Sequence, residues 1–277
     1  MNQNNQRRWI PFRHQSGWER QMKAFSRSLS AAGFALATGV GVVFLSAAVW
    51  ASDEQTAKAI IEKVDRIRFP QGGYQVNVKI TSSAPGRDAD IREYEILSKG
   101  NDRTIIRTLA PASDKGQVLL MRDRDLWIFM PSVSQPIRLA ASQRLTGQVA
   151  NGDLARANFS GDYTPTIIRT ETIESENYLV LELKAVDRSV TYDKVLLWVN
   201  KTNDRPYRAE FYAVSGRLLK TCRFQNYKEA GGAVRPTRLV MDDALVEGAK
   251  SLLDYSDLRS KDVPDRMFAK DYMKRLQ

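Results

Sequence analysis

A long series of short strand-like segments constrains the fold of this chain more than any other feature. The segments begin at Tyr74 and end near Leu258. The first, "YQVNVKI", alternates apolar and polar residues, with Tyr74, Val76, Val78 and Ile80 on one face. Short connectors such as "KTNDRP", "VSG" and "KEAGGAV" join later segments. We therefore expect strands that are neighbours in sequence to pair in an antiparallel meander.

An amphipathic helix is expected ahead of the strands, over Ser52–Phe69. Ser52 and Gln55 form a capping box at its start. One face carries Ile60, Ile61, Val64 and Ile67, and the other carries Glu62, Lys63, Asp65 and Arg66. Pro70 and the two glycines at 72 and 73 end the helix.

A short closing helix is expected at the C-terminus, because Phe268, Tyr272 and Leu276 are spaced four residues apart. Helices at the ends of an antiparallel meander are typical of the α+β class. They cover only part of the sheet. If the sheet curls, its covered face becomes a cavity that suits an apolar ligand.

The segment from Ala140 to Tyr163 interrupts the meander. It is too polar for a core strand and too long for a hairpin loop, and loops of this length are usually functional or disordered. Its scattered apolar residues are Leu145, Val149, Leu154 and Phe159. We expect these to pack down on the sheet like a lid, and we call residues 140–163 the flap.

The run "LWIFM", from Leu126 to Met130, is apolar on both faces of its predicted strand. Trp127 and Phe129 face one way, and Leu126, Ile128 and Met130 face the other. One set should line the cavity, and the other should lie under the flap or form a partner surface. A shift of one residue would exchange the two faces, so the sequence leaves the choice open.

The N-terminal segment has the organisation of a secretory signal. Arg20, Lys23 and Arg27 precede an uncharged stretch from Ala31 to Trp50, and small residues suit cleavage after Ala51. Met22 is an alternative start. An uncleaved membrane anchor is the alternative reading, because about 20 apolar residues span a bilayer. In both cases residues 52–277, one domain's length of chain, are expected outside the cytoplasm.

Charge and composition exclude several classes of function. The net charge is +10, but residues 1–51 hold six basic residues and one acidic residue, which account for half of it. The remaining charges of both signs are interleaved, which argues against a nucleic-acid-binding face. The only histidine, His14, lies in the segment expected to be removed. This excludes Ser-His-Asp and Cys-His catalysis and histidine-ligated zinc.

The remaining chemical candidates are weak. Cys222 is the only cysteine and lies in an alternating segment, so we expect a buried, inert thiol. No phosphate-binding or dinucleotide-binding motif is present. Two acidic pairs, Asp242 with Asp243 and Asp254 with Asp257, keep a hydrolase as an alternative. We expect no catalytic residue, no metal site and no cofactor, and a binding protein rather than an enzyme.

Three stretches of the chain, in order, resemble the LolA-like family of outer-membrane lipoprotein-sorting proteins. They are "LWIFMPSVSQPIRLAASQRLTGQVANGDLARANF", "KVLLWVNKTNDRPYRAEFYAVSGRLLKTCRFQNYKEAGGAVRPTRLVM" and "VPDRMFAKDYMKRL". The resemblance covers nearly all of residues 70–277. Where the family has "SFMGSDF", this chain has "QVANGDL", which keeps Asp153 but places Val149 and Leu154 at the aromatic positions. Because those aromatic residues are expected to touch an acyl chain, the departure leaves the ligand open.

The resemblance implies an unclosed β-barrel whose concave side is capped by the N-terminal helix, the flap and the C-terminal helix. It also implies a periplasmic carrier that shields the acyl chains of a lipid or lipoprotein. Seven residues are candidates for the apolar ligand site: Trp127, Phe129, Val149, Leu154, Phe159, Trp198 and Phe211.

The expected partners are an inner-membrane donor complex or exporter and an outer-membrane acceptor, with the protein acting as a monomer. The alternative that the resemblance also allows is a periplasmic signalling or transporter-accessory module. Such a module would bind a membrane protein, with lipid as a regulator.

Overall fold

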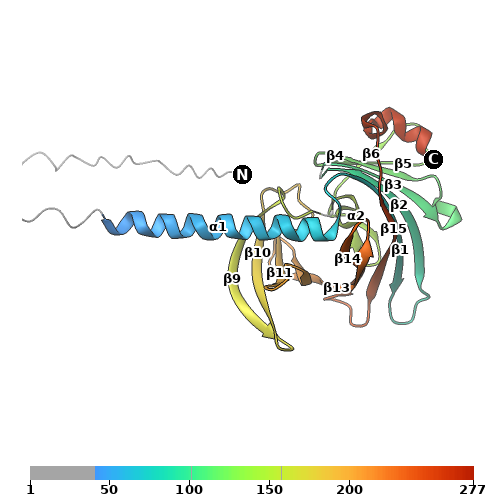
Figure 1. The fold of residues 1–277 in the computed structure, drawn as a ribbon. Helices are drawn as coiled ribbons and strands as arrows, with labels where there is room; N and C mark the ends of the chain where they lie inside the picture. Colours follow the sequence, from blue (N-terminus) through green and yellow to red (C-terminus); the bar gives the residue numbers. More distant parts are fainter. Residues whose placement is uncertain (1–40, 101, 157) are drawn as a thin grey trace, which may run out of the picture. The chain divides into compact units, whose positions relative to one another are not determined.

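Thirteen antiparallel strands form one curled, unclosed sheet in the computed structural model, which describes residues 41–100, 102–156 and 158–277 (Figure 1). The strands are β1 (Gly73–Ser83), β2 (Asp90–Lys99), β3 (Arg103–Ala110), β4 (Val118–Arg122), β5 (Asp125–Phe129), β6 (Ile137–Leu139), β9 (Tyr163–Ile173), β10 (Glu176–Ala185), β11 (Lys194–Asn200), β12 (Pro206–Tyr212), β13 (Leu218–Ala230), β14 (Ala233–Asp243) and β15 (Lys250–Ser260).

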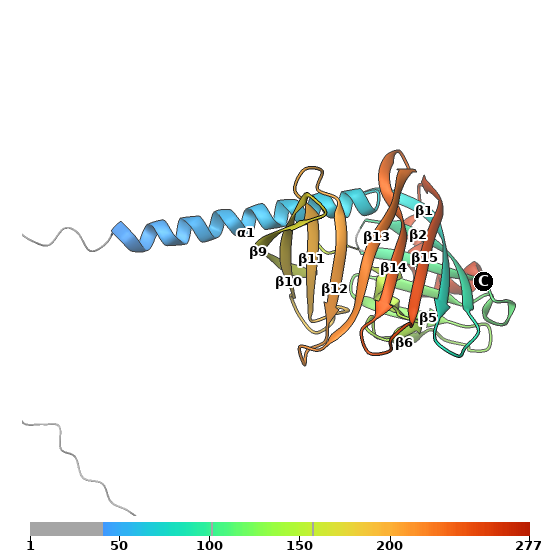
Figure 2. The same cartoon turned by 90° about the horizontal axis from the view of Figure 1, so that it is seen from below.

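Two meanders make up this sheet. One runs from β1 to β6 and the other from β9 to β15, and the two join where β1 pairs with β15. The edge strands are β6 and β9, so the sheet does not close on itself. Figure 2 shows the neighbouring strands of the second meander side by side. The expected meander of sequence neighbours is confirmed, and the α+β class with an unclosed, curled sheet is correct.

Helix α1 (Gly41–Arg68) packs on one face of the sheet, which we call the inner face. Ile60, Ile61 and Val64 of the predicted apolar stripe are buried, as is Ala57, whereas Ile67 is only partly buried. The expected start at Ser52 is wrong for this chain, because the helix continues without a break from Gly41. Within the part of the chain that the structure describes, no helix is long and apolar enough to cross a membrane. Most of the predicted signal segment, residues 1–51, lies outside the described residues.

The C-terminal segment differs from the prediction in form and in position. It consists of two 3₁₀ helices, η2 (Asp265–Phe268) and η3 (Lys270–Leu276), which lie beside β4 and β5 in Figure 1. Phe268 and Met273 pack with Leu97, Ile105 and Leu120, which face away from α1. These helices therefore cover the outer face of the sheet and not its concave side.

The flap contains a small second sheet of β7 (Arg144–Thr146) and β8 (Val149–Ala150), followed by helix α2 (Asn151–Ala155). It connects the edge strands β6 and β9. Val149, Leu154 and Phe159 are buried in the same apolar cluster as α1. The expected packing of the flap on the sheet is confirmed, and α1 and the flap together cover the inner face.

Candidate functional site

The covered inner face of the sheet is the candidate site. Inward side chains from the strands, among them Val78, Leu181 and Leu253, pack against α1 and the flap. Four of the seven candidate ligand residues meet in this cluster: Val149, Leu154, Phe159 and Phe211. Whether a ligand contacts them stays a prediction.

The other three candidates lie on the outer face. Trp127 and Phe129 pack against the C-terminal helices, and the Lys270 Nζ lies 3.9 Å from the centre of the Trp127 ring. Trp198 packs with Tyr178 and Val180 on the outer side of β10 and β11. Side chains alternate between the two faces of a strand, so the residues adjacent in sequence to these three point to the inner face. The structure therefore does not bring these three residues into the inner cluster.

This arrangement explains why "LWIFM" is apolar on both faces. Leu126 and Ile128 pack on the inner cluster, whereas Trp127 and Phe129 pack on the outer one. The C-terminal helices supply the second apolar partner, so both faces of β5 are covered by protein.

A first polar anchor joins the flap to α1. The Asp65 carboxylate accepts hydrogen bonds from the Phe159 amide at 3.0 Å and from the Ser160 amide at 2.8 Å. It also accepts one from the Ser160 hydroxyl at 2.6 Å. Asp65 is only 1% exposed, and burial raises its pKa against the opposing effects of Arg68 and these hydrogen bonds. The predicted position of Asp65 on the exposed face of the helix is wrong.

A second anchor joins the flap to β13 through a buried ion pair. Lys220 Nζ contacts Asp153 Oδ2 and donates to the Gln148 carbonyl at 2.7 Å. The Tyr192 hydroxyl donates to Asp153 at 2.9 Å, and the Asp153 carboxylate also accepts the Ala150 amide at 2.7 Å. The side chains of the ion pair are 4% and 7% exposed. Removing one partner would leave the other charge buried and unpaired.

A third anchor lies where β7 turns into β8, at the ends of β1 and β15. The Thr146 hydroxyl donates to Asp90 at 2.6 Å, and the Gln148 amide donates to the Ser251 hydroxyl at 2.9 Å. Between them Gly147 has a φ of 49°. A Cβ there would lie 2.1 Å from the Ser82 hydroxyl, so both the backbone conformation and the close approach require glycine.

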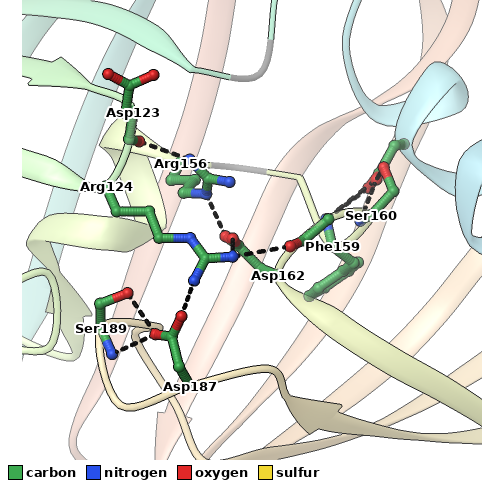
Figure 3. A network of polar contacts seen from close by, with 10 residues as sticks. Asp123, Arg124, Arg156, Phe159, Ser160, Asp162, Asp187 and Ser189 are labelled. Atoms are coloured by element: carbon green, nitrogen blue, oxygen red, sulfur yellow. Dashed lines mark hydrogen bonds and ion pairs between the residues drawn. The ribbon is translucent and has the colours of Figure 1, made fainter.

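A network of arginines and aspartates holds the end of the flap (Figure 3). Arg156 contacts Asp162 and donates to the Asp123 carbonyl at 2.6 Å. Arg124, from the turn between β4 and β5, contacts Asp187 in the loop between β10 and β11. Arg124 also donates to the Gly161 carbonyl at 3.0 Å. The end of the flap is therefore tied to both meanders.

Most of these polar anchors join residues that are far apart in sequence, and local patterns do not predict them. The alternation of residues along β13 predicts that Lys220 is buried, because it points to the same side of the strand as the buried Cys222 and Phe224. Asp65 is four residues from Ile61, at the edge of the apolar stripe. Asp153 was noted only because the family pattern keeps it.

Cavities lie along the margins of the flap. One of about 430 Å³ is lined by Tyr192, Tyr212 and Leu219 among others. Another of about 210 Å³ includes Val149 and Lys220 in its lining. A third, of about 360 Å³, lies at the end of α1, away from the flap. The two larger cavities fall within the size range of small-molecule sites.

The four residues in the acidic pairs have polar partners of their own. Asp242 pairs with Arg223 at 2.8 Å, and Asp254 pairs with Arg238 at 2.6 Å, in both cases with partly exposed side chains. Asp243 caps the turn that follows β14 by accepting the Leu245 amide. Cys222 is buried as expected, and burial raises the pKa of its thiol to about 12. Among the described residues, no group of histidine, cysteine and acidic side chains could hold a metal ion.

Comparison with known proteins places the chain in a family. The crystal structure of a LolA superfamily protein from Nitrosomonas europaea is 61% identical and covers 78% of this chain and 98% of its own, with a TM-score of 0.76. The chain belongs to the LolA superfamily. A family model described as an uncharacterized protein matches residues 100–275 of this LolA superfamily chain. No curated protein sequence matches this chain.

A more distant structure has the same fold as this LolA superfamily chain. It is a putative outer membrane lipoprotein-sorting protein domain from Vibrio parahaemolyticus, 22% identical, with a TM-score of 0.69. It covers 80% of this chain and 100% of its own. At this identity, the likeness supports the fold alone.

Proposed function

We propose that this protein is a periplasmic carrier that shields the acyl chains of a lipid or lipoprotein during transfer toward the outer membrane. The observation that carries the proposal is the cover over the inner face. The flap buries apolar side chains against α1 and the sheet, and discrete polar contacts hold it to α1, β13 and β15. Such a cover can lift as a unit and expose an apolar surface.

The energetics favour a carrier of this kind. Each methylene hidden from water contributes about 0.8 kcal/mol, so an acyl chain leaves a membrane slowly unless another apolar surface receives it. The apolar residues beneath the flap would supply that surface when the flap opens. When no ligand is bound, closure of the flap would cover the same surface with the protein's own side chains.

The rest of the proposal concerns export and partners. Residues 1–51 direct export and are removed after Ala51, and residues 52–277 act as a single domain and as a monomer. An inner-membrane complex donates the cargo, and an outer-membrane component accepts it. The carrier forms no covalent bond with its cargo and requires no cofactor.

A reversible disulfide between the flap and the loop that joins β10 and β11 tests the proposal. A Cβ on Gly152 in α2 would lie 3.1 Å from the Cβ of Thr191, slightly closer than in a disulfide. The double variant Gly152→Cys/Thr191→Cys, made in a Cys222→Ala background, should therefore form a disulfide after a small shift. We expect the oxidised form to lose transfer of a fluorescent phospholipid between vesicles and the reduced form to regain it.

The single variant Thr191→Cys in the same background is the control, because it keeps Gly152 and should not respond to oxidation. Equal transfer by the locked and unlocked forms would contradict the role of the flap. Mass spectrometry of the protein purified from the periplasm without detergent would identify the cargo. Capture of a membrane protein without any lipid transfer would favour the accessory-module alternative.

A further inference from the structure

The loops that follow β10, β12 and β14 lie together at one end of the second meander. They are residues 186–193, 213–217 and 244–249, and we call them the rim. Backbone hydrogen bonds join the bases of neighbouring loops. The Asp193 amide donates to the Tyr212 carbonyl at 3.2 Å, and the Ala244 amide donates to the Leu219 carbonyl at 3.1 Å. Figure 2 shows the turns after β12 and β14 at the same end of the sheet, so the three loops form one surface.

All three loops of the rim expose aliphatic side chains. Val214 is 79% exposed and Leu245 is 56% exposed, the highest values among the large hydrophobic residues that the structure describes. Val186 and Val246 are also exposed. Single exposed aliphatic residues are ordinary on a protein surface. Several on adjacent loops form a patch of the kind that marks a contact with a protein or a membrane.

The turns at the opposite end of the same strands have a different composition. Residues 174–175 follow β9, residues 201–205 follow β11 and read "KTNDR", and two glycines follow β13. Among the described residues at this end of the second meander, Val234 is the one exposed large aliphatic side chain. The exposed aliphatic side chains are therefore concentrated at the rim.

The charges of the rim balance one another. Asp187 is paired with Arg124, which lies outside the three loops. The other charged residues of the loops, all exposed, are Arg188, Arg217, Asp193 and Glu247. Two positive and two negative charges give no net attraction to a strongly acidic or a strongly basic partner. The aliphatic side chains are therefore the main source of affinity that the rim offers.

The rim also borders the cavities along the margin of the flap. Val214 lines the cavity of about 430 Å³, and Leu245 lines the cavity of about 210 Å³ together with Val149 of the flap. Both cavities share Tyr192 and Leu219 in their linings. The two most exposed aliphatic residues of the chain thus lie where the cover of the inner face meets the solvent.

We propose that the rim docks on a lipid bilayer, with Val214, Leu245 and Val246 inserted among the hydrocarbon chains. Arg188 and Arg217 would then lie at the level of the headgroups, where arginine side chains keep their charge in water. The inference rests on the proposed function, because a carrier of acyl chains must reach the membrane that holds them. In this orientation the margin of the flap faces the bilayer, so an acyl chain has a short path from the membrane to the inner face.

A fluorophore placed on the rim tests the docking. Val214→Cys and Val234→Cys, each made in a Cys222→Ala background, provide single labelling sites at the two ends of the sheet. The protein purified from the periplasm is labelled with an environment-sensitive fluorophore and mixed with phosphatidylcholine vesicles. We expect the emission from position 214 to shift to the blue and the emission from position 234 to stay unchanged. Because each label reports its own surroundings, contact of the N-terminal segment with the vesicles does not produce the same result.

Sedimentation with the same vesicles measures how much the aliphatic residues contribute. The double variant Val214→Asn/Leu245→Asn should bind about tenfold or more weakly, since burial of one such side chain already changes a binding constant by about that factor. Asparagine leaves the net charge unchanged. Val234→Asn is the matched control and should bind as the wild type does. High salt should change the binding little, because the exposed charges of the rim are balanced.

The outcomes separate this inference from the proposed function. No shift at position 214, or an equal shift at both positions, would overturn the inference, and the carrier proposal would stand if the protein still transferred fluorescent phospholipid. A shift at position 214 without lipid transfer would support the docking surface and overturn the carrier proposal. Loss of vesicle binding in high salt would show that charges carry the contact and would overturn the assignment to Val214 and Leu245.

Discussion

The outer face beneath the C-terminal helices is closed by apolar side chains, whereas the inner face buries charges beneath its cover. On the outer face, Phe129 and Leu120 meet Phe268 and Met273 in a cluster of buried apolar residues. On the inner face, the apolar cluster surrounds the Asp153–Lys220 pair and the Asp65 carboxylate. Apolar packing of the C-terminal helices on the outer face stabilises the fold, whereas polar contacts at specific positions hold the flap on the inner face.

The energetic reason is the cost of burying charge. A buried ion pair contributes little net stability relative to apolar residues of the same size, because desolvation offsets the attraction. An apolar cluster contributes stability without that penalty. When the flap opens, hydrogen bonds to water can replace the polar contacts that hold it. Water cannot replace the apolar contacts beneath the C-terminal helices in this way.

The largest expected effect is on the outer face. Phe129→Ala should lower the free energy of unfolding by about 4 kcal/mol, because it leaves a cavity in a well-packed cluster. Urea unfolding measures this change. Ile137→Ala, on the neighbouring strand and 46% exposed, is the control and should cost less than about 0.5 kcal/mol. A small effect of Phe129→Ala would mean that the C-terminal helices do not stabilise the sheet.

The next effect is on the inner face. Lys220→Met should cost about 3 kcal/mol, because it leaves the Asp153 carboxylate buried without its cation. Adding Asp153→Asn should recover part of the loss, since the amide oxygen still accepts the Tyr192 hydroxyl. The two single variants and the double variant form a thermodynamic cycle measured by urea unfolding. Strict additivity would show that the pair is not coupled.

A smaller effect is expected where the flap meets α1. Asp65→Asn removes one acceptor oxygen from the Phe159 and Ser160 amides and should cost about 1–2 kcal/mol. Hydrogen exchange at those two amides should accelerate more than exchange in β13. Asp53→Asn, at an exposed position on the same helix, should change neither. Unchanged exchange in Asp65→Asn would contradict the role of this contact as an anchor.

The same carboxylate predicts a dependence on pH. Burial raises the pKa of Asp65 above 3.8, so the folded protein binds this proton more tightly than the unfolded chain does. Stability from this group is complete below that value and is lost as the pH rises through the folded-state pKa. Relative to Asp65→Asn, the wild type should therefore lose stability with rising pH just above 3.8. Thermal unfolding across pH 4–6 measures the difference, and parallel curves would exclude the shift.

The smallest effect is expected at a surface ion pair. Lys63 Nζ lies 3.0 Å from Asp204 Oδ2, and both side chains are substantially exposed. Lys63→Gln should change the free energy of unfolding by less than about 0.5 kcal/mol, because solvent screens the pair. Urea unfolding in low and high salt checks this value. A loss comparable to that in Lys220→Met would remove the distinction between buried and exposed pairs on which the comparison depends.

Local spacing in the sequence was sufficient to predict the long strands, their order and the buried side of α1. Alternation identified the strands, short connectors predicted their antiparallel pairing, and a stripe of isoleucine and valine predicted the buried side of α1. These features depend on residues within a few positions of one another. The flap was predicted in the same way, because its length and polarity interrupt that pattern.

Only the tertiary structure decided which side chains share a surface. Asp65 and Ser160 are 95 residues apart in sequence, and Lys220 and Asp153 are 67 apart, so no local period joins them. The inward face of β5 depends on its pairing register with β4, since a shift of one residue exchanges its two faces. The C-terminal helices cover the outer face because Phe268 and Met273 find an apolar partner there, which helical spacing alone does not reveal.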